Sequence, residues 1–279
     1  MTIQWFPGHM TRAKREIEER LKVVDMVIEC RDSRIPESSV NPLLKSLTIN
    51  KPRLIILTKR DKADPDITAA WIKALSDENT QVLSLDLFND DVRTKVVDGC
   101  KRVMKPKFDR WLAKGVRPRK IRAMVLGIPN VGKSTLINQL GKKKVMVTAD
   151  RPGVTMALKW ASVHPELDLL DTPGVLWPKF DDKTVAMNLA LTGAIKDDVL
   201  PLEEVAFTAY HFLRNFYPGR LEKRYELEVV EDPIVFFNNL AAKRSYLKSG
   251  EADLQRSMAT LVREMRQDEF GAITLERPA

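Results

Sequence analysis

Short apolar runs alternate with amphipathic stretches along the first two thirds of the chain. The runs cover residues 23–30, 52–57, 81–85, 121–126, 156–163 and 167–170, and each has the length of a buried strand. Helices are predicted before and between them, at 11–22, 65–76, 91–104 and 134–140. Strands that alternate with helices in this way predict an α/β fold, with a mostly parallel sheet and helices on both faces.

From about residue 181 the pattern is helical only. Helices are predicted at 183–195, 202–216, 233–247 and 253–268. A chain of 279 residues is long enough for one large and one small domain. We therefore expect an α/β domain over 1–180, followed by a small all-α C-terminal domain over 181–279.

The most specific motif is residues 127–134, which read G-I-P-N-V-G-K-S and fit the phosphate-binding loop G-x-x-x-x-G-K-S. A predicted strand precedes it and a predicted helix follows, which disfavours a chance glycine turn. Backbone N–H groups at such a helix start cradle phosphates, Lys133 adds positive charge, and the Ser134 hydroxyl faces Mg²⁺. The remaining residues of the loop expected to contact a nucleotide are Asn130, Val131, Gly132 and Thr135.

A second motif, D-T-P-G at 171–174, directly follows the apolar run 167–170. In this setting Asp171 is expected to organise Mg²⁺, and the Gly174 N–H to sense a γ-phosphate. The two motifs together predict a nucleotide site without identifying the base.

The base is read from T-K-R-D at 58–61, which ends the run 52–57. In N/T-K-x-D the aspartate accepts two hydrogen bonds that guanine offers and adenine does not, while the lysine stem covers the ring. Thr58, Lys59 and Asp61 are thus expected to bind guanine. A second K-x-D at 196–198 follows a predicted helix, so the copy at a strand end is favoured.

This assignment places the base-reading motif before the phosphate loop, which reverses the usual order in GTPases. The chain is then a circular permutation, in which residues 25–85 supply the later strands and residues 101–122 connect the former ends. Residue 174 leads directly into the helical domain, so GTP hydrolysis is expected to release or reorient that domain.

The net charge of +8 is concentrated in this connector. Residues 101–122 hold ten Lys or Arg and one acid, whereas residues 200–279 hold eleven basic and thirteen acidic side chains. A polyanion such as RNA is a candidate partner of the connector, and a solvated linker is the alternative. Any RNA contact of the C-terminal part is expected to use local patches.

Several classes of protein are disfavoured by the composition. Two cysteines, Cys30 and Cys100, give neither a disulfide framework nor a metal-ligand spacing, and both are expected to be reduced. There is no apolar stretch of about 18 residues and no signal-peptide pattern, so a cytoplasmic location is expected.

Five segments, in their order along the chain, resemble the circularly permuted P-loop GTPases of the YlqF/RbgA family (ribosome biogenesis GTPase A). They are W-F-P-G-H-M at 5–10, R-D-S-R-I-P at 31–36, the phosphate loop, R-P-G-V-T at 151–155 and D-T-P-G at 171–174. The resemblance implies a GTPase that uses GTP, GDP and Mg²⁺ and acts late in assembly of the large ribosomal subunit. It also implies that the C-terminal helical domain contacts ribosomal RNA. A monomer without a membrane partner is expected.

The resemblance also implies roles for single residues. Lys133 and Ser134 would hold phosphates and Mg²⁺, and Thr155 would close over the γ-phosphate and join the Mg²⁺ ligands. Ser84 and Leu85 would lie near the guanine carbonyl oxygen.

Two residues keep alternative interpretations. By its spacing His9 is a packed or capping imidazole, whereas the resemblance makes it a candidate catalytic group. Asn130 resembles the asparagine of potassium-activated GTPases, in which K⁺ replaces an arginine finger. Its alternative role is a hydrogen bond that shapes the loop.

Two positions depart from the usual GTPase pattern. Thr58 stands where asparagine is more usual, which predicts a weaker brace between the base and the phosphate loop. Val175 stands where many GTPases have a water-orienting glutamine, which implies slow intrinsic turnover and a catalytic group supplied otherwise.

These observations support three functional hypotheses. The first is a GTP-hydrolysing assembly factor stimulated by large ribosomal subunits. The second is an RNA-docking GTP switch in which hydrolysis is incidental, motivated by the missing glutamine and the basic connector. The third, an ATPase, requires that Asp61 does not read guanine.

Overall fold

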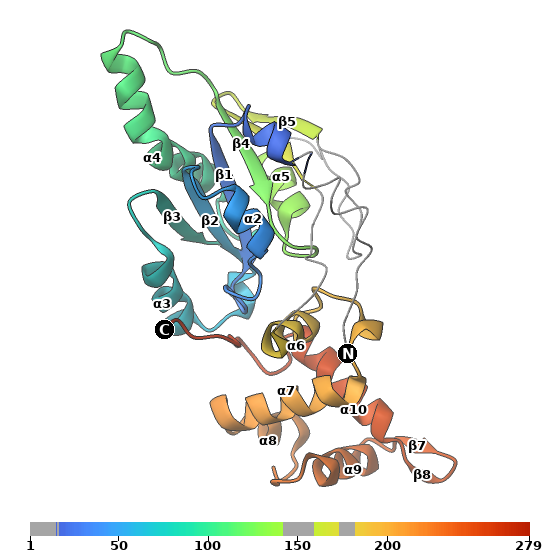
Figure 1. Cartoon of the computed structure of the whole chain (residues 1–279). Helices are drawn as coiled ribbons and strands as arrows, with labels where there is room; N and C mark the ends of the chain where they lie inside the picture. Colours follow the sequence, from blue (N-terminus) through green and yellow to red (C-terminus); the bar gives the residue numbers. More distant parts are fainter. Residues whose placement is uncertain (1–14, 16, 142–158, 173–181) are drawn as a thin grey trace. The chain divides into compact units, whose positions relative to one another are not determined.

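The computed structural model describes residues 15, 17–141, 159–172 and 182–279, and the elements below refer to these residues. The chain forms two compact units, Met1–Asp181 with Glu276–Ala279, and Asp182–Leu275 (Figure 1). The sequence-based division placed 276–279 with the helices. The structure places them with the first unit instead, because the Glu276 carboxylate accepts hydrogen bonds from the backbone N–H groups of Glu37 (2.7 Å) and Ser38 (2.9 Å).

Six strands among the described residues form the sheet of the first unit, in the order β3-β2-β1-β4-β6-β5. They are β1 Met26–Asp32, β2 Arg53–Thr58, β3 Thr80–Ser84, β4 Ile121–Leu126, β5 Lys159–His164 and β6 Leu167–Asp171. Neighbouring strands are parallel, except for the antiparallel pair of β5 and β6. The expected mostly parallel sheet is confirmed. Successive strands add outward from β1 on one side and from β4 on the other, so the switch point, where ligands bind in such sheets, lies between β1 and β4.

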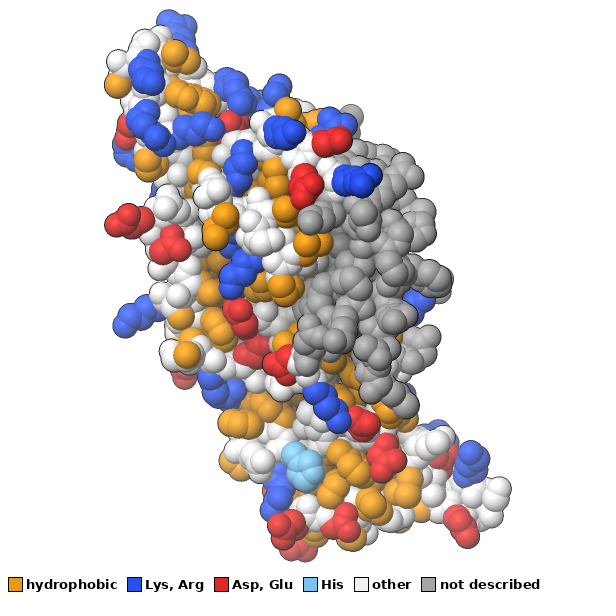
Figure 2. Space-filling model, in the orientation of Figure 1, with side chains coloured by type: hydrophobic (Ala, Val, Ile, Leu, Met, Phe, Trp, Pro, Cys, Tyr) orange, Lys and Arg blue, Asp and Glu red, His pale blue; other side chains and the backbone are white. Residues whose placement is uncertain are grey.

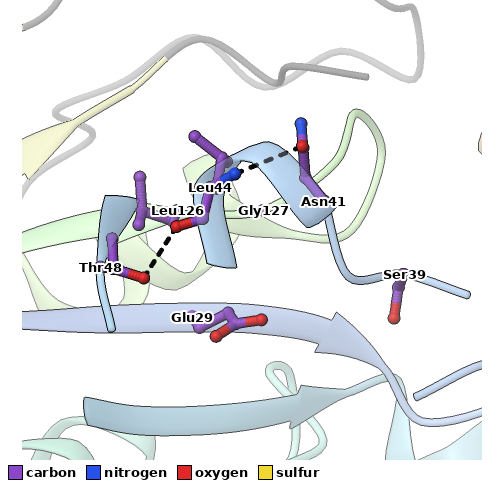
Figure 3. Close-up of a pocket in the computed structure, with 7 residues that line it drawn as sticks. All are labelled: Glu29, Ser39, Asn41, Leu44, Thr48, Leu126 and Gly127. Carbon is purple, nitrogen blue, oxygen red and sulfur yellow. Dashed lines mark hydrogen bonds between the residues drawn. The ribbon is translucent and has the colours of Figure 1, made fainter. Parts of the chain in front are cut away.

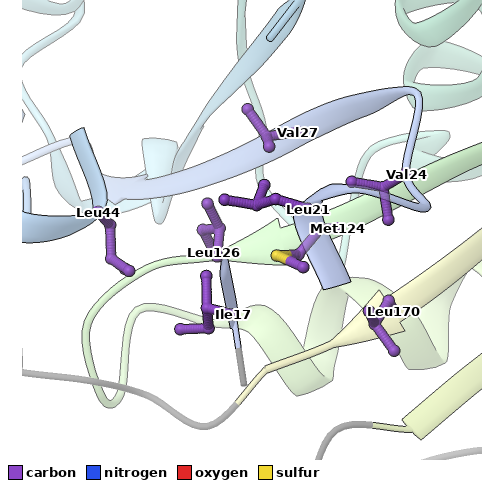
Figure 4. Close-up of a cluster of buried hydrophobic side chains, with 8 residues drawn as sticks. All are labelled: Ile17, Leu21, Val24, Val27, Leu44, Met124, Leu126 and Leu170. Carbon is purple, nitrogen blue, oxygen red and sulfur yellow. The ribbon is translucent and has the colours of Figure 1, made fainter. Parts of the chain in front are cut away.

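Helices cover both faces of this sheet. They are α2 Pro42–Leu47, α3 Pro65–Leu75, α4 Val92–Ala113 and α5 Lys133–Leu140, with a 3-10 helix at Arg60–Lys62. One face packs against α2 and the residues before β1, in a cluster of Ile17, Leu21, Val24, Val27, Leu44, Met124, Leu126 and Leu170 (Figure 4). On the opposite face, α4 lies so close that a Cβ at Gly99 would be 3.1 Å from Leu83 and 3.2 Å from Leu54.

Two helices differ from the sequence-based expectation. The helix expected to end at residue 104 continues to Ala113 through Pro106, which lacks an N–H and removes one helical hydrogen bond. Side-chain contacts bridge the proline, since Lys105 pairs with Asp109 at 2.7 Å and Arg110 Nε donates to the Pro106 carbonyl at 3.2 Å. Helix α2 was not predicted, although proline in the first turn and a capping Asn41 side chain are both start signals.

The second unit is helical apart from one short hairpin. It contains α6 Lys183–Leu191, α7 Leu202–Phe216, α8 Arg220–Tyr225, α9 Pro233–Lys243 and α10 Leu254–Arg266, a 3-10 helix at Asp197–Val199, and the hairpin β7 Leu247–Lys248 with β8 Glu251–Ala252. Its core includes the fully buried rings of Tyr210, Phe236 and Phe237. Helix α9 ends earlier than expected, at Lys243, and Ser245 just beyond it has a φ of 53° that is incompatible with a right-handed helix.

Cys30 and Cys100 are free and buried, as expected. Burial raises the pKa of each thiol to about 12, so neither is a reactive thiolate near neutral pH. Among the described helices, none combines the length and apolarity needed to cross a membrane.

Candidate nucleotide-binding site

The phosphate loop connects β4 to α5 at the switch point of the sheet. Gly127 has a φ of 149°, and a Cβ there would lie 2.6 Å from the Cys30 carbonyl oxygen and 2.9 Å from Val131 Cγ1. Gly132 has a φ of 99° and caps the start of α5. Both glycines are therefore required by the backbone path, and the strand–loop–helix context expected for this motif is present.

Lys133 is the buried cation of the loop. Its Nζ donates hydrogen bonds to the carbonyl oxygens of Gly127 (3.0 Å) and Ile128 (2.7 Å). Burial lowers the pKa of Lys133 to about 8, against the opposing effect of the nearby Cys30 and Asp171 side chains. The ammonium thus lies inside the loop that would hold phosphates.

We expect the affinity for GTP to fall as the pH rises above about 8. The pKa of Lys133 is lowered to about 8, so the charged form that attracts phosphate is populated below that pH and is lost above it. The loss should approach about tenfold per pH unit, measurable with a fluorescent nucleotide from pH 6.5 to 9.5. In a Lys133→Arg control the charge persists, so a similar slope in that variant would contradict the assignment.

Asp171 and Ser134 carry the oxygen atoms that are expected from the sequence to bind Mg²⁺. Asp171 ends β6 in register with Val125 of β4, and it is fully buried. The next residue, Thr172, donates a hydrogen bond to the Val125 carbonyl at 2.6 Å, which fixes this strand end. A hydroxyl and a carboxylate suit Mg²⁺, which usually takes one or two protein ligands together with phosphate oxygens and water. Groups of three or more His, Cys, Asp or Glu that could hold a metal are absent from the described residues.

The base-reading motif is tied to the phosphate loop. The Thr58 hydroxyl lies 2.7 Å from the Val131 carbonyl oxygen and 3.1 Å from that of Arg31, and it is buried. Threonine was expected to bind the phosphate loop more weakly than asparagine would. Thr58 nevertheless makes the hydrogen bond that joins this motif to the loop. Lys59 follows with a left-handed φ of 56°, and Asp61 is exposed in the 3-10 helix.

Ser84 and Leu85 lie beside this motif at the end of β3. The Leu85 N–H donates to the Leu57 carbonyl at 2.9 Å, and the Leu85 carbonyl accepts from the Arg60 N–H at 3.3 Å. The Leu85 amide is therefore engaged in the sheet. The Ser84 hydroxyl is buried without a hydrogen-bond partner among the described residues.

The remaining sequence-based candidates lie elsewhere. The rival K-x-D at 196–198 belongs to the second unit, where it follows α6 and no strand. Asn130 lies in the phosphate loop with a φ of 56° and is half-buried. His9, Thr155 and Gly174 lie outside the described residues.

A small cavity lies behind the phosphate loop. It has a volume of about 10 Å³ and is lined by residues that include Glu29, Asn41, Leu44 and Gly127 (Figure 3). This volume holds about one water molecule, so the cavity is not the nucleotide site.

Sequence reasoning missed the part that Asp32 plays at this site. Asp32 ends β1, opposite Thr58 in the sheet register, and its carboxylate lies 2.9 Å from Lys59 Nζ. The segment R-D-S-R-I-P was noted only as part of the family resemblance. A charged residue at the end of a buried strand, at the edge where ligands bind, was the available signal.

Comparisons with known proteins identify the family. A family model described as "50S ribosome-binding GTPase" matches residues 122–209. The ribosome biogenesis GTPase A of Bacillus pumilus is 46% identical over 280 residues, covering 100% of this chain and 99% of that protein. The chain belongs to the ribosome biogenesis GTPase A family. A relative of the same name from Priestia megaterium is 47% identical over 282 residues, covering 100% of this chain and 98% of that protein.

Solved structures of ribosome biogenesis GTPase A relatives share the fold. GNP-bound YlqF from T. maritima superposes with a TM-score of 0.67 at 25% identity, covering 96% of this chain and 98% of that chain. A GDP-bound structure of YlqF gives a TM-score of 0.69 at 25% identity, covering 95% and 99%. The family model starts in β4, and the base-reading motif at 58–61 lies before it, as a permuted order requires.

Proposed function

We propose that this chain binds and hydrolyses GTP as an assembly factor in maturation of the large ribosomal subunit, in the cytoplasm and as a monomer. The observation that carries the proposal is the hydrogen bond from Thr58 to the Val131 carbonyl, which joins the guanine motif to the phosphate loop. A single pocket for base and phosphates is the arrangement that a GTPase needs. The ribosomal role rests on the name and full-length similarity of the relatives.

The residues divide the work of binding. Lys133 and the N–H groups at the start of α5 hold phosphates, Ser134 and Asp171 with Thr155 hold Mg²⁺, and Asp61 reads the base. Bound Mg²⁺ supplies charge neutralisation at the phosphates. The Gly174 N–H responds to the γ-phosphate and passes the nucleotide state to the helical unit.

Catalysis needs a group other than the usual glutamine, because Val175 cannot orient water. His9 is the polar side chain that takes the place of this glutamine. Asn130 would hold K⁺, which takes the place of the arginine finger of other GTPases. Bound there, K⁺ would supply positive charge at the phosphates.

We expect slow GTP turnover by the isolated chain and at least about tenfold acceleration by large ribosomal subunits in K⁺ buffer. The measurement is phosphate release with and without subunits, in K⁺ and in Na⁺. Unchanged turnover with subunits in K⁺ would count against the assembly-factor proposal, and equal rates in both salts would remove the K⁺ role of Asn130.

A second candidate function is an RNA-docking switch in which GTP occupancy matters and hydrolysis is incidental. The observation that favours it is Val175. A His9→Ala variant that binds GTP without turnover, compared with a Lys133→Ala variant that does not bind, separates the two. If the His9→Ala variant supports subunit maturation in cells, the switch is correct; if it fails, hydrolysis is required.

The end of α4 is the best candidate for contact with ribosomal RNA. Met104 is the last buried residue of this helix, and beyond it the side chains of Lys105, Arg110, Lys114 and Arg117 are exposed. Figure 2 shows Lys and Arg side chains gathered on this part of the surface. Two further cations of the connector bind Asp25, which accepts from Lys107 at 3.0 Å and from Arg119 at 2.9 Å.

We expect replacement of Lys105, Arg110, Lys114 and Arg117 by Gln to weaken RNA binding and to flatten its salt dependence. Each lost phosphate contact reduces the slope of log K against log salt by about 0.7–0.9. The control replaces four exposed lysines elsewhere on the first unit, Lys22, Lys45, Lys73 and Lys95. An equal slope for both variants in a filter-binding titration would show that α4 ends in a solvated connector.

A further inference from the structure

Lys59 of the base-reading motif is anchored at both ends of its side chain. At the backbone it takes a left-handed conformation (φ 56°, ψ 39°), and its neighbours Thr58 and Arg60 are hydrogen-bonded to Val131 and Leu85. At the tip, Nζ lies 2.9 Å from Asp32 Oδ2. A non-glycine residue held in this backbone region is uncommon, so the surrounding structure imposes the conformation.

Asp32 is itself held rigidly. The Arg34 guanidinium makes two hydrogen bonds to it, Nε to Oδ1 at 3.0 Å and Nη2 to Oδ2 at 2.8 Å, and the Arg34 backbone N–H donates to Oδ1 at 3.0 Å. Both side chains are 4% exposed. Burial alone would raise the pKa of Asp32, but the charges and hydrogen bonds of Arg34 and Lys59 outweigh it and hold the pKa well below its usual range. The carboxylate is therefore ionised and oriented near neutral pH.

The loop that carries Arg34 is braced in turn. The Ser39 hydroxyl donates to the Ile35 carbonyl at 2.6 Å and accepts from the Asp32 N–H at 3.2 Å. The Ser33 N–H donates to the Thr58 carbonyl at 2.9 Å, which ties the loop to β2. Glu276 caps the N–H groups of the same loop.

We propose that Asp32, oriented by Arg34, is a positioning residue for guanine recognition. By binding the Lys59 ammonium, Asp32 holds the Lys59 side chain extended, so that its apolar stem packs on the face of the guanine ring. The inference rests on the proposed guanine site. A lysine stem fixed at both ends loses little conformational freedom when a base packs on it, which favours binding. Pairing with Asp32 also holds the Lys59 ammonium away from the phosphates. Lys133 supplies the positive charge that binds the phosphates.

The test compares Lys59→Met with wild type. Methionine keeps an apolar stem of similar length and loses only the bond to Asp32, and Lys59 is 25% exposed, so the fold should persist. Without the anchor the stem must be ordered when the base binds, which predicts about 2- to 10-fold weaker GDP binding, with ATP binding unchanged. Asp32→Asn should have the same effect, and the double variant should be no worse than either single variant.

A buried carboxylate in the same strand provides the control. Glu29 pairs with Arg31 at 2.9 Å and with Arg53 at 3.2 Å, away from Lys59. Glu29→Gln should leave the preference for GDP over ATP unchanged. The proposal would be overturned if Lys59→Met bound GDP as tightly as wild type does. It would also be overturned if the double variant lost as much GDP affinity as the two single variants together, or if Glu29→Gln lost as much GDP affinity as Lys59→Met. Failure of wild type itself to prefer GDP over ATP would instead overturn the proposed guanine site.

Discussion

Asp61→Asn should exchange guanine for xanthine as the preferred base. The Asp61 carboxylate is exposed at the sheet edge, in the helical turn after Lys59, where it can accept from the ring N–H and the exocyclic amine of guanine. A carboxamide presents a donor in place of one acceptor, which fits the carbonyl that xanthine has at the same position. The expected loss of GDP affinity is about 1,000-fold, since a site built to accept hydrogen bonds discriminates strongly against a mismatched pattern.

Competition of GDP, XDP and ADP against a fluorescent nucleotide measures this exchange. The matched control is Asp66→Asn, an exposed carboxylate in the first turn of α3, which should bind as wild type does. If Asp61→Asn still prefers GDP, guanine is read by other residues. If ADP competes as well as GDP in the wild type, the ATPase hypothesis returns.

Gly127→Ala should destabilise the first unit and abolish nucleotide binding. The new Cβ would lie 2.6 Å from the Cys30 carbonyl oxygen, a backbone atom that cannot move aside without shifting β1. The φ of 149° adds strain for any residue with a side chain. The expected cost is about 2–4 kcal/mol, or a fall of about 5–15 °C in the unfolding midpoint of a unit of this size.

Gly115→Ala separates the clash from the backbone strain. Gly115 also has a positive φ, of 70°, but a Cβ there meets no atom within 4 Å. Calorimetry should show a cost of about 1 kcal/mol or less for Gly115→Ala, with nucleotide affinity unchanged. Equal unfolding midpoints for Gly127→Ala and Gly115→Ala would mean that the close contact with the Cys30 carbonyl oxygen does not cause the loss of stability.

The parts of the fold set by local signals could be predicted from sequence. Helix α7 was predicted at its observed bounds from a regular apolar stripe, and β4 was predicted at its observed bounds from an apolar run interrupted only by Arg122. Strand β1 extends two residues farther than expected, to Asp32, since a sheet can bury an ion pair that a hydropathy pattern excludes. Helix α4 continues through Pro106 to Ala113, which the local helix-breaking signal of proline does not predict.

The candidate site was predictable as far as its motifs reach along the chain. The phosphate loop and the base-reading motif are each continuous in sequence, and the sheet brings them together as a parallel fold requires. The bond between Asp32 and Lys59 joins residues on neighbouring strands, and the engagement of the Leu85 amide depends on its pairing with β2. Such contacts follow from register, which single-sequence patterns do not specify.

The return of the chain at Glu276 makes the helical unit an insertion rather than an appendage. The chain leaves the first unit after Asp181 and rejoins it at Glu276, whose carbonyl accepts a hydrogen bond from Trp71 Nε1 at 3.3 Å. A fluorophore or affinity tag placed on residue 279 would therefore report on the GTP-binding unit. A probe of helical-unit motion has to be placed within 182–275.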